Sequence, residues 1–201
     1  VRQGEVWAEQ AKLTADDGAG GDQLGMVVSL SGETAAVWNS AQHAVYVFVR
    51  QGATWTQQAK LTIPHGTGSH WTSVSLSGDT VLVGAPGDAP YGSAFVFERQ
   101  GTTWSEQAKL IPVGASAAGG FGFTVSLSGD TAVIGAHYSD GPAGPSQGAA
   151  YLFERQETTW TQQAKWTASD AAAEEYFGYS VAVDGDVDRA VALQELLREQ
   201  A

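Results

Sequence analysis

The chain has 201 residues, 43% of them hydrophobic, which is enough for one domain with a sizeable core. Its formal net charge of −12 at pH 7 argues against nucleic acids and anionic membrane surfaces as partners, since binding to either requires clustered Lys and Arg. Because cysteine is absent, disulfides, thiolate metal sites and cysteine nucleophiles are excluded.

The chain contains an internal repeat. Aligning each Arg-Gln pair and the tryptophan that follows it gives four units with periods of 48, 49 and 56 residues. Periods near 50 residues are typical of propeller blades or solenoid turns. Many glycines and aromatic residues indicate short strands joined by tight turns, so we predict an all-β protein. The units start at Arg2, Arg50, Arg99 and Arg155 and span residues 2–49, 50–98, 99–154 and 155–186.

Each unit contains four strand patterns, named a to d in chain order. Strand a begins at a tryptophan and alternates apolar residues with Thr, Gln and Lys, which indicates a strand with one solvated side. A lysine in every copy suits an outer edge strand, where charge discourages pairing with another chain. The copies of strand a are residues 7–13, 55–61, 104–110 and 160–166.

The other three strands of a unit are more apolar. Strand b, as in residues 74–77, alternates apolar residues with serine, and a Ser-Gly-Asp or Ser-Gly-Glu hairpin turn leads into strand c. Strands c and d, such as residues 132–136 and 149–153, are nearly continuous apolar runs, which indicates burial on both faces. This combination is typical of a propeller blade, because neighbouring blades cover both of its faces.

Short recurring sequence motifs also resemble those of a known family. Phe121-Gly122 and Phe177-Gly178 precede strand b, and Gly84-Ala85-Pro86 ends strand c. With these motifs and the recurring Gln-Ala-Lys-Leu and Ser-Gly-Asp-Thr motifs, residues 1–186 resemble the FG-GAP repeat of integrin α-type β-propellers, in its bacterial form. The resemblance implies a blade made of strands b, c and d of one unit, completed by strand a of the next.

On this scheme we predict a β-propeller-like array of four-stranded antiparallel blades, three complete and a fourth partial. The fourth unit has strand b near residues 179–184 and at most a degraded strand c at 189–193. Residues 187–201 are rich in Ala, Leu, Glu, Gln and Arg, and we expect a short helical C-terminal tail there. Exposed faces of the outermost blades could then pair in a homo-oligomer.

Calcium is the first ligand to consider, since the resemblance implies an acidic calcium loop between strands b and c in many repeats. Units 1 to 3 have short Ser-Gly-acid turns in this place. In unit 4, Asp184, Asp186 and Asp188 alternate, but the glycine and the later acid of a calcium loop are replaced by Arg189 and Ala192. The pattern favours an acidic turn over a calcium site.

The remaining polar clusters also favour structural roles. Each histidine occurs in one unit only and none has the spacing of a metal site. Acids gather in the loops between strands a and b of units 1 and 4, where solvation is the simpler explanation. These side chains are His43, His65, His70, His137, Asp16, Asp17, Asp22, Asp170, Glu174 and Glu175. We predict no metal, no cofactor and no catalytic residue.

Aromatic residues that break the repeat are the candidates for ligand binding. The tryptophan that opens strand a recurs in every unit, which favours packing. Trp38, Trp71 and Tyr138 do not recur, and we expect them to contact a ligand. The loop 139–147 of unit 3 is rich in Gly and Pro and is suited to form the rim of such a site.

The function favoured by the sequence is a non-enzymatic binding, adhesion or scaffold module that recognises a protein or glycan surface through its blade loops. The resemblance implies an extracellular or cell-surface location, with no signal peptide in this chain and no membrane insertion. Two alternatives remain open. One is a hydrolase that uses loop carboxylates, whose separation is a spatial property. The other is an incomplete propeller without independent function.

Overall fold

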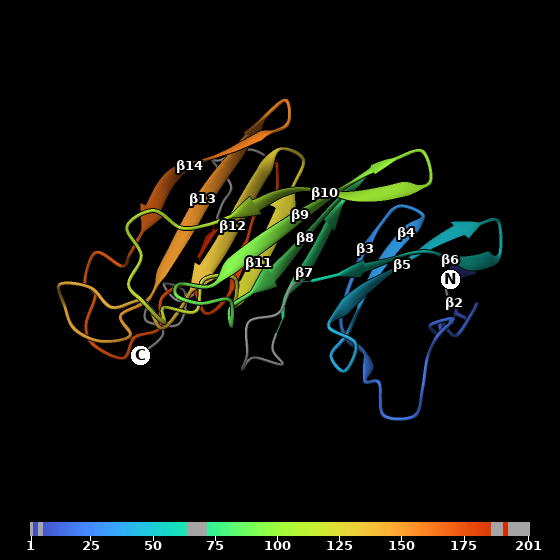
Figure 1. Cartoon of the computed structure of the whole chain (residues 1–201), viewed down its shortest axis with the longest axis horizontal. Coiled ribbons are helices and arrows are strands. Elements are labelled where there is room, and N and C mark those ends of the chain that lie inside the picture. The colour runs from blue at the N-terminus through green and yellow to red at the C-terminus, as the bar shows by residue number, and fades with distance from the viewer. Residues whose placement is uncertain (1, 4–5, 64–71, 186–190, 193–201) are drawn as a thin grey trace.

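The computed structural model describes residues 2–3, 6–63, 72–185 and 191–192, and in this part of the chain every regular element is a β-strand. Three four-stranded antiparallel sheets follow one another along the chain and lie side by side in a row (Figure 1). They are called blades 1, 2 and 3 in chain order. The all-β array of blades expected from the repeat is therefore confirmed.

Each blade takes its strands in the order in which they occur along the chain. Blade 1 consists of β3 (Leu24–Ser31), β4 (Thr34–Asn39), β5 (Ala44–Gln51) and β6 (Thr54–Thr62). Blade 2 consists of β7 (Val74–Ser77), β8 (Thr80–Ala85), β9 (Ser93–Gln100) and β10 (Thr103–Leu110). Blade 3 consists of β11 (Thr124–Ser128), β12 (Thr131–Ala136), β13 (Ala149–Gln156) and β14 (Thr159–Trp166). Strands b, c and d are thus completed by strand a of the next unit.

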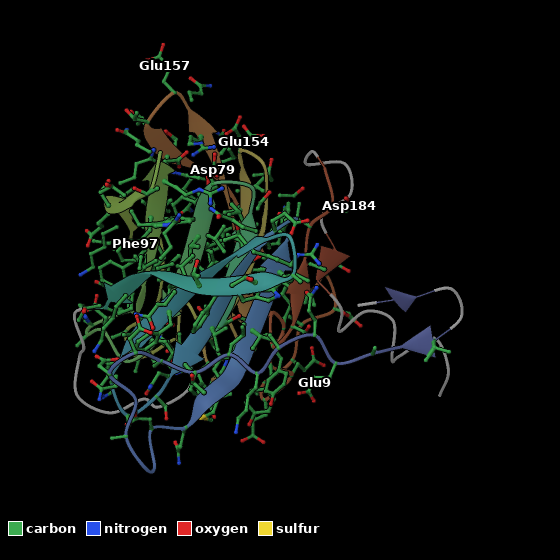
Figure 2. All side chains as sticks on the ribbon, turned by 90° about the vertical axis from the view of Figure 1, so that its right-hand side faces the viewer. Glu9, Asp79, Phe97, Glu154, Glu157 and Asp184 are labelled. Carbon is green, nitrogen blue, oxygen red and sulfur yellow. The ribbon has the colours of Figure 1, made fainter. Side chains whose placement is uncertain are left out.

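The two ends of the chain carry smaller sheets. β15 (Val181–Ala182) pairs with β16 (Val191–Ala192) as strands b and c of a partial fourth blade. The strand at Val191–Ala192 corrects the helix predicted for 187–201, because these two residues pair in a sheet; residues 187–190 and 193–201 lie outside the described residues. At the other end, β1 (Arg2–Gln3) and β2 (Val6–Trp7) form a hairpin that projects from the blades (Figure 2).

The hydrophobic core lies between blades. Strands c and d are buried along most of their length, as their continuous apolar runs predict. One cluster joins Leu82 and Val96 of blade 2 to Val125 and Ile134 of blade 3, and a second joins blades 1 and 2 in the same way. Each blade is therefore stabilised largely by the burial of its faces against its neighbours.

The serines of strand b connect the innermost strands of successive blades. Ser75 of β7 accepts a hydrogen bond from the N–H of Leu127 in β11, and Ser77 accepts one from the N–H of Gly129, both at 3.0 Å. β7 and β11 belong to different sheets, so these edge N–H groups have no partner in their own blade. Equivalent bonds to neighbouring blades are accepted by Ser29, Ser31, Ser126 and Ser128. The alternating serines are thus contacts between blades.

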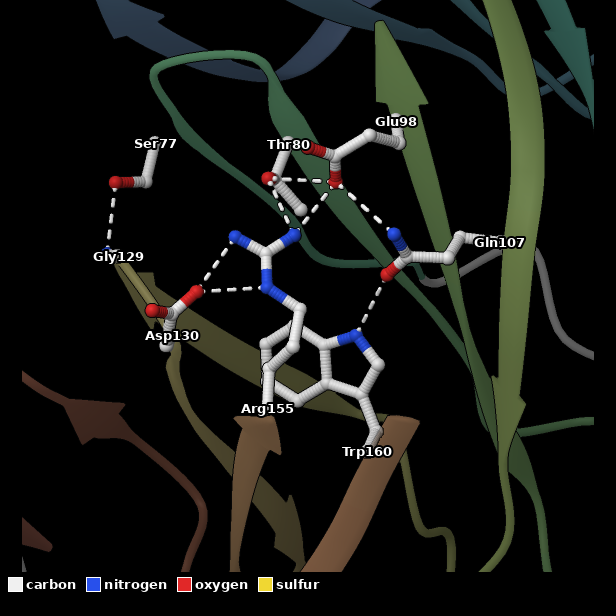
Figure 3. A network of polar contacts seen from close by, with 8 residues as sticks. All are labelled: Ser77, Thr80, Glu98, Gln107, Gly129, Asp130, Arg155 and Trp160. Carbon is white, nitrogen blue, oxygen red and sulfur yellow. Dashed lines mark hydrogen bonds and ion pairs between the residues drawn. The ribbon is translucent and has the colours of Figure 1, made fainter. Parts of the chain in front are cut away.

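A second set of contacts joins the outer strands (Figure 3). Arg155 of β13 binds Asp130 in its own blade, with Nη2 at 2.6 Å, and Glu98 of blade 2, with Nη1 at 2.6 Å. Its guanidinium lies over the ring of Trp160, whose Nε1 donates to Gln107 of blade 2 at 3.0 Å. The same tryptophan-to-glutamine bond recurs in the pairs Trp55–Gln10 and Trp104–Gln58. The recurring Trp, Gln and Arg side chains therefore pack blade against blade.

The glycines of the Phe-Gly and Gly-Ala-Pro motifs allow the backbones of neighbouring blades to come into contact. A Cβ added to Gly84, at the end of β8, would lie 1.8 Å from the carbonyl oxygen of Gly122. Gly122 has a φ of +92°, and Phe121 before it is fully buried. Gly135 and Gly178 repeat this approach between blade 3 and the fourth unit, at 2.0 Å. A side chain at either strand c glycine would meet backbone that cannot move aside.

We expect Gly84→Ala to lower the free energy of unfolding by about 2–4 kcal/mol, because the new methyl group forces two blades apart. Denaturant unfolding followed by tryptophan fluorescence measures this change. Gly20→Ala is the matched control, since a Cβ at Gly20 meets nothing within 4 Å. Equal stability of the Gly84→Ala variant and the wild type would contradict the close approach.

Candidate functional site

A cavity of about 560 Å³ lies at the end of the blades where strands c finish. Its wall combines loops from blade 2, blade 3 and the fourth unit, which are far apart in the sequence. The wall includes the β8–β9 loop at 86–92, the segment 118–123 before β11, His137 and Tyr138 after β12, and Tyr179. The cavity is therefore a product of the packing between blades.

Backbone hydrogen bonds hold these loops in place. The N–H of Ala118 donates to the carbonyl oxygen of Pro90 at 2.7 Å, which ties the segment before β11 to blade 2. The N–H of Tyr138 donates to the carbonyl oxygen of Gly119 at 3.1 Å, which ties the residues after β12 to the same segment. The cavity wall is consequently cross-linked by main-chain contacts.

Aromatic rings gather around His137 in this wall. The centre of the imidazole lies 3.9 Å from that of Tyr138, 4.0 Å from Phe123 and 5.3 Å from Tyr179. Tyr176 contacts both His137 and Tyr138. Tyr138 is 53% exposed and Tyr179 is 58% exposed, although both are large hydrophobic side chains. The cluster thus has a buried imidazole and two exposed phenol rings.

His137 is 2% exposed, and its Nδ1 has no hydrogen-bond partner among the described residues. Burial lowers the pKa of His137 below its ordinary value of 6.5, because the charged imidazolium would lose its hydration. The neutral ring can accept or donate one hydrogen bond at Nδ1, depending on the tautomer. Gly120 lies next to this atom, and a Cβ there would be 4.0 Å from Nδ1. The unpartnered nitrogen therefore lies at the cavity wall, beside a residue without a side chain.

Asp88 contributes a charge to the wall. Its carboxylate accepts hydrogen bonds from Lys109 Nζ at 2.7 Å and from Ser93 Oγ at 2.6 Å. Burial tends to raise the pKa of Asp88, but the bonds from Lys109 and Ser93 outweigh it and hold the pKa below 3.8. The carboxylate is thus ionised and paired, and the wall offers mainly aromatic and backbone groups to a ligand.

The three predicted ligand-binding residues lie in different places. Tyr138 lines the cavity. Trp38 is 2% exposed and lies in the core between blades 1 and 2. Trp71, with His65 and His70 of the same loop, lies outside the described residues. The structure thus brings Tyr138, but not Trp38, to a described surface.

Tyr179 and the β8–β9 loop were not among the residues predicted to contact a ligand. Tyr179 follows the Phe-Gly motif of unit 4, at the position that Phe123 occupies in unit 3. The aromatic residue directly after Phe-Gly is the sequence feature that could have indicated Tyr179 as a site residue. Its position close to His137, and so to Tyr138, depends on how the fourth unit packs against blade 3, which no spacing within a unit shows.

The acidic loops form no metal cluster in the part of the chain that the structure describes, where no group of three or more His, Asp and Glu could hold an ion. A hydrogen bond from Lys60 Nζ, at 2.6 Å, holds the pKa of Asp17 below its ordinary value. Asp184 is exposed, while Asp186 and Asp188 lie outside the described residues.

Comparison with known families gives four matches to the FG-GAP repeat, over residues 7–48, 55–97, 104–153 and 160–192. Each match begins at the tryptophan that opens strand a, and the first three end within strand d. No curated protein matches the chain.

We expect the free energy of unfolding to fall as the pH drops below 6.5, since the unfolded chain binds a proton at His137 more readily than the folded chain does. The contribution is fully present above the ordinary pKa and is lost as the pH falls through the lowered one. Urea unfolding from acid to neutral pH, compared with His137→Phe, isolates this dependence. An NMR titration that places the pKa of His137 at or above its ordinary value would contradict the buried neutral ring.

Proposed function

Because the chain belongs to the FG-GAP repeat family and its repeats form β-propeller-like blades, we propose that it is a non-enzymatic binding or adhesion module that recognises a protein or glycan surface through its blade loops. One observation carries the proposal. Two exposed tyrosines, Tyr138 and Tyr179, both contact the buried His137 in the wall of one cavity.

Exposed aromatic rings suit such a role physically. Leaving two large apolar faces in water is unfavourable unless a partner covers them, and loops held by a rigid scaffold are common places for binding residues. A tyrosine presents an apolar face to a sugar ring or an aliphatic side chain, and its hydroxyl can hydrogen-bond at the same time. The unpartnered Nδ1 of His137 adds a polar group that a hydroxyl or amide of the ligand can satisfy.

The non-enzymatic part of the proposal rests on the family and on the surroundings of His137. FG-GAP repeats are generally non-enzymatic modules. Among the described residues, no carboxylate hydrogen-bonds to the imidazole, and its ring contacts are to Phe123, Tyr138, Tyr176 and Tyr179. A general base is usually oriented by a hydrogen-bonded acid and faces a nucleophile, so these neighbours favour recognition over proton transfer.

We propose an extracellular or cell-surface location, because FG-GAP repeats are typical of extracellular proteins. Within the described residues, no helix has the length and hydropathy needed to cross a membrane. The strongly acidic chain suits a protein or glycan partner and disfavours a nucleic acid.

The direct test is to apply the purified chain to a glycan array and to a set of immobilised extracellular proteins, and to assay each bound ligand for turnover. Binding without turnover is the expected outcome. Turnover that a single carboxylate substitution abolishes would overturn the proposal in favour of a hydrolase.

We expect Tyr138→Ala to weaken the binding of any ligand found in this way at least tenfold, which is the usual effect of removing a central aromatic contact. The melting temperature is expected to change little, because the ring is half exposed. Val113→Ala serves as the control, since Val113 is 72% exposed and does not line the cavity. Equal losses of affinity in both variants would argue against this site.

A further inference from the structure

The hydrogen bonds that strand b and the strand a tryptophans make to the preceding blade run in one direction. The N–H of Leu76 donates to Ser29 in blade 1, and the N–H of Leu127 donates to Ser75 in blade 2. The tryptophan-to-glutamine bonds have the same direction, from the later blade to the earlier one. The two ends of the row therefore differ. The first strand b, β3, has backbone N–H donors with no preceding blade, and the last, β15, has side-chain acceptors with no following blade among the described residues.

The donor end leaves an apolar surface exposed. Val28 and Leu30 of β3 are 64% and 67% exposed, and Met26 beside them is 46% exposed. The counterparts in β7 and β11 are each 6% exposed, because the preceding blade covers them; they are Val74, Leu76, Val125 and Leu127. Among the described residues, no side chain accepts a hydrogen bond from the N–H of Leu30 or Gly32. The β3 face thus has the composition of a blade interface without the neighbouring blade.

The segment before blade 1 covers only the outer part of this face. Leu13 and Ala15 pack against residues of β4 and β5, and Gln10 accepts the hydrogen bond from Trp55. Figure 2 looks onto this end of the row and shows the segment crossing blade 1 before it leaves for the projecting hairpin. The uncovered surface is therefore confined to β3, the innermost strand.

The acceptor end carries a matching edge. The positions that face the next blade in earlier copies of strand b are occupied in the fourth unit by Ser180, Ala182 and Asp184, and all three are exposed. Ser180 corresponds to Ser73, which accepts from the N–H of Val125 at 3.1 Å, and Asp184 corresponds to Ser77. Two oxygen acceptors are thus retained, and Ala182 replaces the third.

We propose that the β3 face binds the β15 edge of a second copy of this chain, head to tail. In this arrangement Ser180 and Asp184 of one copy accept from the N–H groups of Val28 and Gly32 of the other. A carboxylate that accepts from a backbone N–H makes a charge-assisted bond, which is stronger than the serine bond it replaces. Burial of Val28 and Leu30 adds the apolar contribution that the same positions make within the chain.

A second copy is the partner that fits best, because both halves of this directional interface are present on one chain and the interface recurs along it. Blades 1 and 3 lie at opposite ends of the row, so the two edges meet between copies (Figure 1). Contacts of this kind are heterologous, and they close a ring or extend a row of copies.

Light scattering coupled to size-exclusion chromatography, from about 1 µM to about 1 mM, tests the proposal. The mass is expected to rise with concentration above that of one chain. Leu30→Asp is expected to weaken association at least tenfold while the melting curve is retained, since Leu30 is exposed in the single chain. Val113→Asp, at an equally exposed position outside β3, is the control and leaves association unchanged.

Ala182→Ser separates this arrangement from other modes of self-association. The added hydroxyl restores the third acceptor, and we expect it to lower the Kd about fivefold, the factor that corresponds to a net hydrogen bond of about 1 kcal/mol. Asp184→Ala is expected to raise the Kd. A mass of one chain at every concentration for both wild type and Ala182→Ser would overturn the proposal. Association that neither substitution changes would also overturn it, because it would indicate that β3 faces pair with each other.

Discussion

The unpaired edge of strand b is the constraint on which the row of blades depends. Each blade is a separate sheet, so the inner-edge N–H groups of β7 and β11 have no partner within their own blade. A buried donor without a partner costs about 1–3 kcal/mol. Serine at alternate positions of the preceding strand b removes this cost, while the residues between the serines stay apolar and fill the space between blades. One short pattern therefore supplies both the polar and the apolar parts of the interface.

The cavity depends on the same constraint. The bonds from Leu127 and Gly129 to Ser75 and Ser77 align the inner strand of blade 3 with the inner strand of blade 2. The close approach at Gly84 then brings the loops of the two blades into contact. Tyr138 and the β8–β9 loop meet for this reason, although they are far apart in the sequence. The candidate site is thus a consequence of how repeats stack.

The features that could be predicted from the sequence are those encoded within one unit. Strand alternation, apolar runs and the period are local patterns, and they predicted the blades. The completion of each blade by strand a of the next unit was implied by the resemblance to the FG-GAP repeat. Trp38 shows the limit of prediction from local patterns, because a tryptophan that breaks the repeat is equally compatible with a core or a surface position. In the structure, Trp38 lies buried in β4. At Val191–Ala192, pairing with β15 prevails over the helix propensity of the surrounding residues. Tyr179 required knowledge of packing between units.

Native-state hydrogen exchange of the wild type and of Ser75→Ala tests the serine contact most directly, since Leu127 N–H bonds to Ser75 whereas Gly129 N–H bonds to Ser77. The account predicts that the Leu127 amide is protected in the wild type and exchanges faster in the variant, while the Gly129 amide keeps its protection. Unchanged protection of Leu127 after removal of the hydroxyl would contradict the claim that these serines join the blades.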